Sequence, residues 1–310
     1  MAGKLMHAVH YANCGGGPSD LKCVEVPVPT PKKDEVLIKV EAVSISPIDW
    51  VIQQGGLKPM FPRELPQIPG TNVAGEVVDV GSGVKNVKAG DKVIAMTGLA
   101  NGGGLAEFAV AKANLTVIRP LEVSAAEGAS IPESGLMAHQ ALTDSAESVG
   151  NFAIQLAKLG NAHVRATCAP EHIDLAKSLG ADEVVDQTTP GGQALKSPSG
   201  KKYDVVIHRG EPTSWSTFEP HLASKGKIFD VKPSLSSVKA YTLKKLTFSK
   251  KQLIPVLLNC KAENIDFLVK LVKEGKVKTV IDSKYSLSNA EDAWAKNAEN
   301  KIFGKIILEP

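Results

Sequence analysis

The 310-residue chain has few cysteines, no long hydrophobic run and almost no net charge. Its four cysteines form no Cys-x-x-Cys pair, which argues against a disulfide framework and a structural zinc lobe and favours a reduced compartment. The 36 basic and 33 acidic side chains leave a formal charge of +3, so the sequence shows no electrostatic footprint for nucleic acid. No apolar run approaches the roughly 18–20 residues that a membrane span needs.

The first residues carry no targeting signal of the usual kind. They contain neither the apolar core of a signal peptide nor an arginine- and serine-rich transit segment. We therefore expect no cleavable targeting segment, which is compatible with a cytoplasmic location. Lysine pairs at residues 244–245 and 250–251 are expected to form a solvated face, with peripheral membrane association as the alternative.

Glycine and proline, by contrast, are abundant, with 27 and 19 residues. In the first third of the chain they separate β-rich runs at residues 36–40, 73–80, 91–95 and 107–118. Short β-rich runs between turn signals predict an antiparallel, barrel-like domain.

From Ser124 onward the pattern changes to alternating helices and strands. Ser124 and Glu127 have the spacing of a capping box that opens a helix. Apolar runs at residues 203–208 and 226–231 are typical of buried parallel strands. The middle of the chain is therefore predicted to be a doubly wound α/β unit of the dinucleotide-binding type.

The tail of the chain returns to β character at residues 277–281 and 304–308. A β-rich start and end around an α/β middle indicate that both termini belong to one domain. We predict a substrate domain formed by residues 1–122 and 275–310, and a nucleotide-binding domain formed by residues 123–274.

Three longer motifs carry a family resemblance. Residues 69–81 read PGTNVAGEVVDVG, residues 87–93 read VKAGDKV, and residues 269–283 read VKLVKEGKVKTVIDS. Together they resemble the zinc-free quinone oxidoreductase branch of the medium-chain dehydrogenase/reductases, including its plant chloroplast envelope members. The resemblance covers nearly the whole chain.

The resemblance implies both a fold and an activity. The fold would be a GroES-like β-barrel domain joined to a Rossmann-like doubly wound parallel sheet. The activity would be NADPH-dependent hydride transfer to a quinone, or to the C=C bond of an α,β-unsaturated carbonyl, with the protein orienting the cofactor. A small-molecule substrate, a monomer or homodimer, and a chloroplast envelope location are the matching expectations.

The positions of the family's zinc ligands are occupied by other residues. Thr71 and Asn72 stand where zinc-dependent relatives carry a His-Glu pair, and Ser44 to Ser46 stand where those relatives carry a Cys. We therefore expect metal-free chemistry.

The nucleotide-binding half departs from the family pattern. Family members place a polar loop, the first Rossmann strand and a glycine-rich turn after a motif like the one ending at Thr143. Here residues 143–150, TDSAESVG, run directly into the helical pattern at 151–159. About 20 residues, including a strand that would bury about four side chains, are missing, at a loss of roughly 6–12 kcal/mol. Glu147 also places a carboxylate where a pyrophosphate would sit.

Two residues are candidates for substrate chemistry in a pocket between the domains. Ser46 would offer a hydroxyl to a carbonyl oxygen, and Asp49 would offer a hydrogen bond to a cofactor ribose or a neighbouring backbone group. The alternative is a local turn around Pro47 that satisfies both side chains. No Ser/His/Asp or Cys/His arrangement can be defended from the spacing, so hydrolysis is unsupported.

Five residues are candidates for holding NADPH. Ser148, Val149 and Gly150 would meet the phosphates through backbone N–H groups, or would simply begin a helix. Arg165 could bind the 2′-phosphate, although an ordinary strand residue is the favoured interpretation. His208 ends a strand at the ligand edge of the sheet and is either a cofactor contact or a solvated strand end.

Three accounts of the missing segment remain open. The sequence could come from a transcript or gene model that skipped a coding segment. It could be a genuine member that has lost NADPH binding and serves as a catalytically silent binding or partner protein. Finally, residues 136–143 could rebuild the strand at the expense of a helix, because their pattern is ambiguous between the two.

Overall fold

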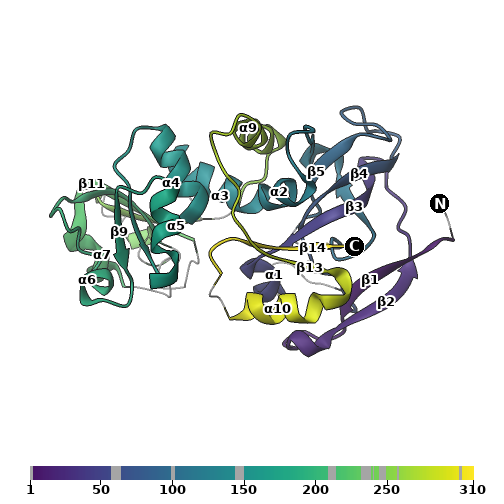
Figure 1. Ribbon diagram of the computed structural model, residues 1–310, viewed down its shortest axis with the longest axis horizontal. Helices are drawn as coiled ribbons and strands as arrows, with labels where there is room; N and C mark the ends of the chain where they lie inside the picture. Colours follow the sequence, from purple (N-terminus) through teal and green to yellow (C-terminus); the bar gives the residue numbers. More distant parts are fainter. Residues whose placement is uncertain are drawn as a thin grey trace. The chain divides into compact units, whose positions relative to one another are not determined.

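Figure 1 shows the computed structural model, which describes residues 3–56, 64–98, 102–143, 150–208, 214–231, 239, 241–243, 249–256, 258–299 and 302–310. The chain forms two compact units. Unit 1 comprises Met1–Pro132, Cys260–Lys273 and Thr279–Pro310, and unit 2 comprises Glu133–Asn259 and Glu274–Lys278.

Unit 1 is built on a seven-stranded sheet with the order β13-β14-β3-β4-β5-β7, in which β6 also pairs with β3. Its strands are β3 (Glu35–Ile45), β4 (Asn72–Val80), β5 (Lys92–Met96), β6 (Phe108–Lys112), β7 (Thr116–Ile118), β13 (Ile281–Ser286) and β14 (Lys305–Glu309). The antiparallel β14–β3 pairing sets Ile307 opposite Ser44, so the two ends of the chain share one sheet. A separate hairpin joins β1 (Leu5–Tyr11) to β2 (Leu21–Pro27).

The core of unit 1 lies beneath this sheet. Val36 and Ile38 of β3 and Val73 and Val77 of β4 belong to one buried cluster with Trp294, whose side chain is fully enclosed. Trp294 belongs to helix α10 (Ala290–Ala298), which contacts helix α1 (Pro47–Gln53) and strand β14. The β-rich start of the sequence thus forms the antiparallel domain that its turn pattern predicts.

Two helices join unit 1 although the expected nucleotide-binding domain, residues 123–274, would include both of them. Helix α2 (Ala125–Ser130) begins at the predicted capping box and packs against β3, where the Ser44 hydroxyl donates to the Ala129 carbonyl at 2.8 Å. Helix α9 (Ala262–Lys273) packs against β7 and ends on a 3.2 Å ion pair between Lys273 and Glu122. Each helix therefore belongs to unit 1 through its contacts with the strands of that unit, although its position in the sequence lies within the expected nucleotide-binding domain.

Residues 277–281 do not form the strand that their composition favours. In the structure β13 begins only at Ile281. The backbone of Lys278 bonds to the side-chain amide of Gln155 instead of to a neighbouring strand. This amide donates to the Lys278 carbonyl at 2.9 Å and accepts from the Lys278 N–H at 2.7 Å.

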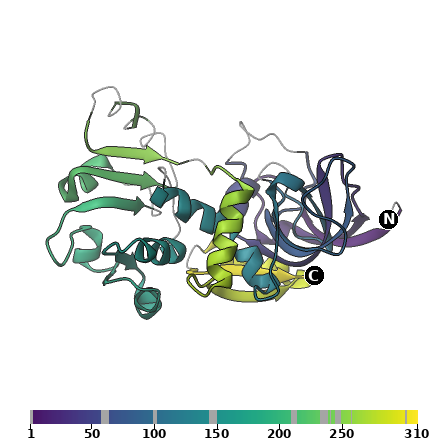
Figure 2. The same cartoon turned by 90° about the horizontal axis from the view of Figure 1, so that it is seen from above.

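Unit 2 has the doubly wound composition that the sequence predicts, but its parallel sheet is divided. Strands β8 (Arg165–Cys168) and β9 (Glu183–Asp186) form one parallel pair. Strands β10 (Tyr203–His208), β11 (Leu222–Asp230) and β12 (Gln252–Pro255) form a second parallel sheet. Figure 2 shows the strands of this second sheet, in green, running in one direction. The helices of this unit are α3 (Pro132–Thr143), α4 (Gly150–Leu159), α5 (Ile173–Ser178), α6 (Pro190–Gln193) and α7 (Trp215–Phe218).

The division falls where the first Rossmann strand was expected to be missing. Among the described residues, helix α3 is followed directly by helix α4 with no strand between them. The account in which residues 136–143 rebuild the strand is wrong, because they lie inside α3, where Leu136 is fully buried. The predicted fold class, a β-rich domain joined to a Rossmann-like parallel α/β unit, is confirmed.

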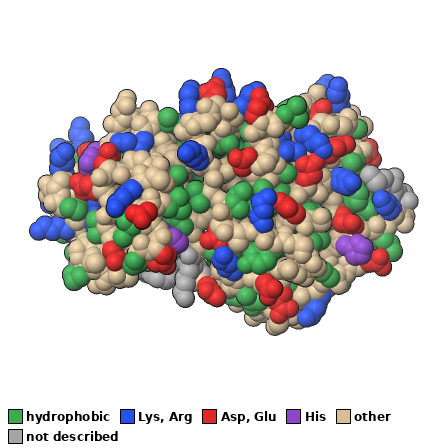
Figure 3. Space-filling model, in the orientation of Figure 1, with side chains coloured by type: hydrophobic (Ala, Val, Ile, Leu, Met, Phe, Trp, Pro, Cys, Tyr) green, Lys and Arg blue, Asp and Glu red, His purple; other side chains and the backbone are tan. Residues whose placement is uncertain are grey.

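The surface shows no single-sign field on the face drawn in Figure 3. Lysine and arginine side chains are interspersed with acidic ones across that face. Of the helices in the described ranges, none is long and apolar enough to cross a membrane.

Strands β3 and β4 approach each other closely at Gly75. A bulge shifts the pairing register between Val40 and Ala42, directly beside Gly75. A Cβ at Gly75 would collide with the backbone carbonyl oxygen of Lys39 and lie 2.9 Å from Cγ2 of Ile38. We expect Gly75→Ala to destabilise the protein by about 3 kcal/mol in urea unfolding, because the clash involves backbone that cannot move aside. Gly150→Ala is the control, since nothing lies within 4 Å there, and equal losses would contradict the prediction.

Candidate functional site

The loop that enters helix α1 brings Ser46 and Asp49 together, as the sequence suggests. Ser46 is the N-cap residue, and the carboxylate of Asp49, three residues later, turns back toward it. Asp49 Oδ2 accepts from the Ser46 backbone N–H at 2.9 Å and from the Ser46 hydroxyl at 3.1 Å. Both residues are buried, with 0% and 2% of their surface exposed. This is the local turn that was the alternative to a substrate site.

The pairing has a chemical consequence for Ser46. A hydroxyl carries one proton, and in this structure that proton points to Asp49. Ser46 would therefore have to rotate its hydroxyl before donating to a substrate carbonyl. A role of Ser46 and Asp49 toward substrate stays a prediction.

Helix α10 fixes this loop from the far end of the sequence. Asn297 Nδ2 donates to the backbone carbonyl of Ser46 at 3.0 Å, and the Trp294 indole N–H donates to Gln53 Oε1 at 2.7 Å. All four residues are buried, so each bond is made out of water. Sequence reasoning missed Asn297 and Gln53. No local signal links Asn297 to Ser46, 251 positions away, or Gln53 to Trp294, 241 positions away.

The positions of the family's zinc ligands are also buried and polar. Thr71 and Asn72 are 1% and 0% exposed, and Asn72 Nδ2 donates to Thr71 Oγ1 at 3.1 Å. Within the residues that the structure describes, no group of three His, Cys, Asp or Glu side chains is placed to hold a metal ion.

The expected phosphate contacts are only partly within the described structure. Ser148 and Val149 lie outside the described residues. Gly150 is the first residue of α4 and is exposed, and nothing lies within 4 Å of the place where its Cβ would be. Gly150 therefore provides open space rather than a close-fitting phosphate cradle.

Arg165 is the first residue of β8, whereas ligands of parallel sheets bind beyond the carboxyl ends of the strands. Its guanidinium donates to the Tyr203 hydroxyl and lies 5.7 Å from the centre of that ring. This contact agrees with the favoured interpretation of Arg165 as a strand residue. A contact between Arg165 and a 2′-phosphate stays a prediction.

His208 does end β10 at the carboxyl edge, as predicted. Its half-buried ring meets the edge of Phe218, with the ring centres 4.9 Å apart and the planes at 68°. The ring is thus packed in the protein rather than simply solvated. A contact between His208 and a cofactor stays a prediction.

Two carboxylates lie near the carboxyl end of β8. The pKa of the Cys168 thiol is raised above its ordinary value, first by burial and then by the charges of Asp186 and Glu171. Among the described residues the parallel sheet of unit 2 is divided, which distinguishes it from the continuous sheet of an ordinary dinucleotide-binding domain.

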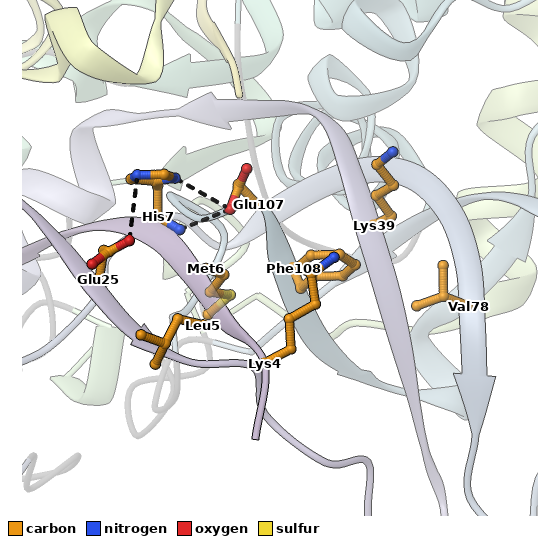
Figure 4. Close-up of a pocket in the computed structure, with 9 residues that line it drawn as sticks. All are labelled: Lys4, Leu5, Met6, His7, Glu25, Lys39, Val78, Glu107 and Phe108. Carbon is orange, nitrogen blue, oxygen red and sulfur yellow. Dashed lines mark hydrogen bonds and ion pairs between the residues drawn. The ribbon is translucent and has the colours of Figure 1, made fainter. Parts of the chain in front are cut away.

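A separate pocket of about 420 Å³ opens on unit 1 beside the β1–β2 hairpin. It is lined by Lys4, Leu5, Met6, His7, Glu25, Lys39, Val78, Glu107 and Phe108. Figure 4 shows His7 between two carboxylates, with Nδ1 at 3.5 Å from Glu107 and Nε2 at 3.9 Å from Glu25. None of the predicted site residues lines this pocket, and sequence reasoning did not single out its residues.

Comparison with known proteins gives a consistent picture. Residues 32–121 match the alcohol dehydrogenase GroES-like domain, and residues 179–308 match the zinc-binding dehydrogenase family. The chain is 57% identical to a chloroplast envelope quinone oxidoreductase homologue of Arabidopsis thaliana, with both chains covered completely. It is 31% identical to the chloroplastic NADPH-dependent alkenal/one oxidoreductase of that plant, covering 99% of this chain and 80% of the relative. A solved quinone oxidoreductase from Coxiella burnetii superposes with a TM-score of 0.86 at 28% identity, covering 99% and 100% of the two chains.

The alignment to the first Arabidopsis relative is longer than this chain. It extends over 329 positions, 19 more than the 310 residues of this chain, while covering all of both proteins. This difference in length is close to the loss of about 20 residues that the sequence pattern indicates.

His221 makes the stability of unit 2 depend on pH. Burial lowers the pKa of His221 below its ordinary 6.5, and the charges of Lys202, Arg165 and Lys196 lower it further. The unfolded chain therefore binds this proton more readily, and stability falls as the pH drops through about 6.5. We expect the midpoint of urea unfolding to fall between pH 7.5 and pH 5.5 in the wild type, and to fall less in His221→Gln. His10→Gln, in unit 1, is the control, and identical losses in His221→Gln and wild type would refute the prediction.

Proposed function

Because the chain belongs to the medium-chain dehydrogenase/reductase superfamily, we propose that it is an NADPH-dependent reductase of quinones or of the C=C bond of α,β-unsaturated carbonyls. The proposed reaction needs no metal. The observation that carries the proposal is the 57% identity to a quinone oxidoreductase homologue along the whole chain. The printed name of the 31% identical relative, an alkenal/one oxidoreductase that depends on NADPH, supports the same cofactor and substrate class.

The proposal includes weak cofactor binding. Unit 2 lacks a central strand among its described residues, and the carboxylates of Asp186 and Glu171 lie near the end of β8. A pyrophosphate needs backbone N–H groups at a helix start and positive charge nearby, so both features support weak binding. The proposed substrate residues, Ser46 and Asp49, lie in unit 1, whose strands form one continuous sheet.

The divided sheet also favours a second candidate, a catalytically silent binding or partner protein. Such a protein would keep the folded unit 1 and lose turnover with the cofactor site. If a skipped coding segment explains the shorter chain instead, transcripts sequenced across residues 143–148 will mostly contain the segment.

NADPH titration separates the two candidates. Following nicotinamide fluorescence, we expect saturable binding about 100-fold weaker than that of the Arabidopsis relative, because the phosphate contacts are incomplete. Slow reduction of a quinone or an enone should accompany it. Inserting between Thr143 and Gly150 the segment that this relative carries there should recover most of the affinity.

The outcomes of this titration are distinct. No NADPH binding by the well-folded original chain, with binding recovered by the insertion, would establish the silent protein. No binding by either chain would reject the cofactor assignment itself. Affinity equal to that of the relative would contradict the proposed weakening.

Ser46 is proposed to contact the substrate carbonyl after its hydroxyl turns away from Asp49. We expect Ser46→Ala to lower kcat/KM for the quinone about 10- to 100-fold, which is the loss expected for one hydrogen bond of 1.5–3 kcal/mol. Ser44→Ala is the matched control, because Ser44 is equally buried and donates instead to a helix carbonyl. Equal losses in the two variants would show that burial of a serine, and not the substrate contact, matters.

The location follows from the relatives alone. The named plant relatives are chloroplastic, so we propose a peripheral association with the chloroplast envelope. Chloroplast fractionation with a carbonate wash tests this, and recovery of the protein only outside chloroplasts would refute it.

A further inference from the structure

The pocket beside the β1–β2 hairpin has walls from two sheets of unit 1. Strands β1 and β2 supply one wall, and β3, β4 and β6 supply the other. Backbone hydrogen bonds join the two walls, since the Glu107 N–H donates to the His7 carbonyl at 3.0 Å and the Val9 N–H donates to the Leu105 carbonyl at 2.8 Å. The volume of about 420 Å³ is in the usual range for a site that takes a small organic molecule. The fold therefore preforms this pocket.

The floor of the pocket is apolar. Met6 and Phe108 are only 4% and 7% exposed and belong to one buried cluster, against which Val78 packs. All three residues line the pocket. An aromatic ring and a thioether in one cluster offer a surface on which a ring or a short alkyl chain can pack.

Two lysines at the pocket have no carboxylate partner. The Lys4 ammonium lies over the Phe108 ring, 5.5 Å from its centre, and Lys39 of β3 lines the same pocket (Figure 4). Within the part of the chain that the structure describes, neither lysine forms an ion pair. The residue opposite Lys39 on β4 is Glu76, but this carboxylate pairs with Lys92 at 2.8 Å.

The carboxylates at the pocket, in contrast, lie against His7. Glu107 accepts from the His7 backbone N–H at 2.8 Å and lies 3.5 Å from Nδ1 of the His7 ring. Nε2 of the same ring lies 3.9 Å from Glu25. The charged groups that lack a partner are therefore the two ammonium groups. Charge complementarity favours a ligand that brings one negative charge to Lys4 and Lys39.

We propose that this pocket is a binding site for a small amphipathic carboxylate, separate from the Ser46 site. The apolar body of the ligand would pack on Met6 and Phe108, and its carboxylate would pair with the ammonium groups of Lys4 and Lys39. A bound ring would replace the Lys4 ammonium on the face of Phe108. The cation–π contact would thereby be exchanged for a charge-assisted hydrogen bond to the carboxylate.

Three matched probes test the proposal on the complete chain. Phenylbutyrate, phenylbutanol and phenylbutylamine share one apolar body and differ in a negative, neutral or positive end. Followed by amide NMR shifts, phenylbutyrate should give saturable shifts confined to the residues that line the pocket. Its affinity should be about 10-fold higher than that of phenylbutanol, the ratio expected for one charge-assisted hydrogen bond. Phenylbutylamine should bind no more tightly than phenylbutanol.

Two lysine variants make the test specific. Lys4→Gln and Lys39→Gln should each weaken phenylbutyrate binding about 10-fold and leave phenylbutanol binding no weaker. Lys22→Gln is the matched control, because Lys22 is an exposed lysine of β2 that does not line the pocket. All three lysines are exposed, so each variant should keep the Tm of the original chain. These readouts require neither NADPH nor turnover, so their failure is distinct from failure of the proposed function.

Several results would overturn the proposal. One is equal affinity for phenylbutyrate and phenylbutanol, which would mean that the apolar floor alone binds the probes. Another is tightest binding of phenylbutylamine, which would place the charge selection at Glu25 and Glu107. Shifts outside the pocket, unchanged affinity in both lysine variants, or no binding of any probe would equally reject it.

Discussion

The continuity of a parallel sheet is the constraint on which the rest of unit 2 depends. An interior parallel strand needs neighbours on both edges for its hydrogen bonds and cover on both faces for its apolar side chains. Among the described residues of unit 2, β8 and β10 each pair on one edge only, and Val205 of β10 is exposed. The Arg165 guanidinium at the start of β8 contacts the Tyr203 hydroxyl at the start of β10.

Basic and acidic side chains gather at opposite ends of the strands of unit 2. The cations that lower the pKa of His221, namely Lys202, Arg165 and Lys196, cluster near the start of β10. The carboxylates of Asp186 and Glu171 act on Cys168, where β8 ends. Phosphates bind at the carboxyl ends of such strands, so these three cations lie at the opposite end. The proposal of weak cofactor binding rests on this placement and on the divided sheet.

The sheet of unit 1 is continuous, because its strands pair with one another. Strand β3 has partners along both edges, and the last strand of the chain, β14, is one of them. The polar groups buried beside it are satisfied in a short network in which Ser46 bonds Asp49 and Asn297 bonds the Ser46 carbonyl.

Much of this was determined by the sequence alone, because it depends on local pattern. Turn spacing predicts the β-rich unit, the Ser124 capping box predicts the start of α2, and the direct step from residue 143 to 151 predicts the missing strand. Only the tertiary structure decided that Arg165 contacts Tyr203, and that Asn297 donates to the Ser46 carbonyl. These pairs are 38 and 251 positions apart, and chain proximity carries no information about contacts that packing alone creates.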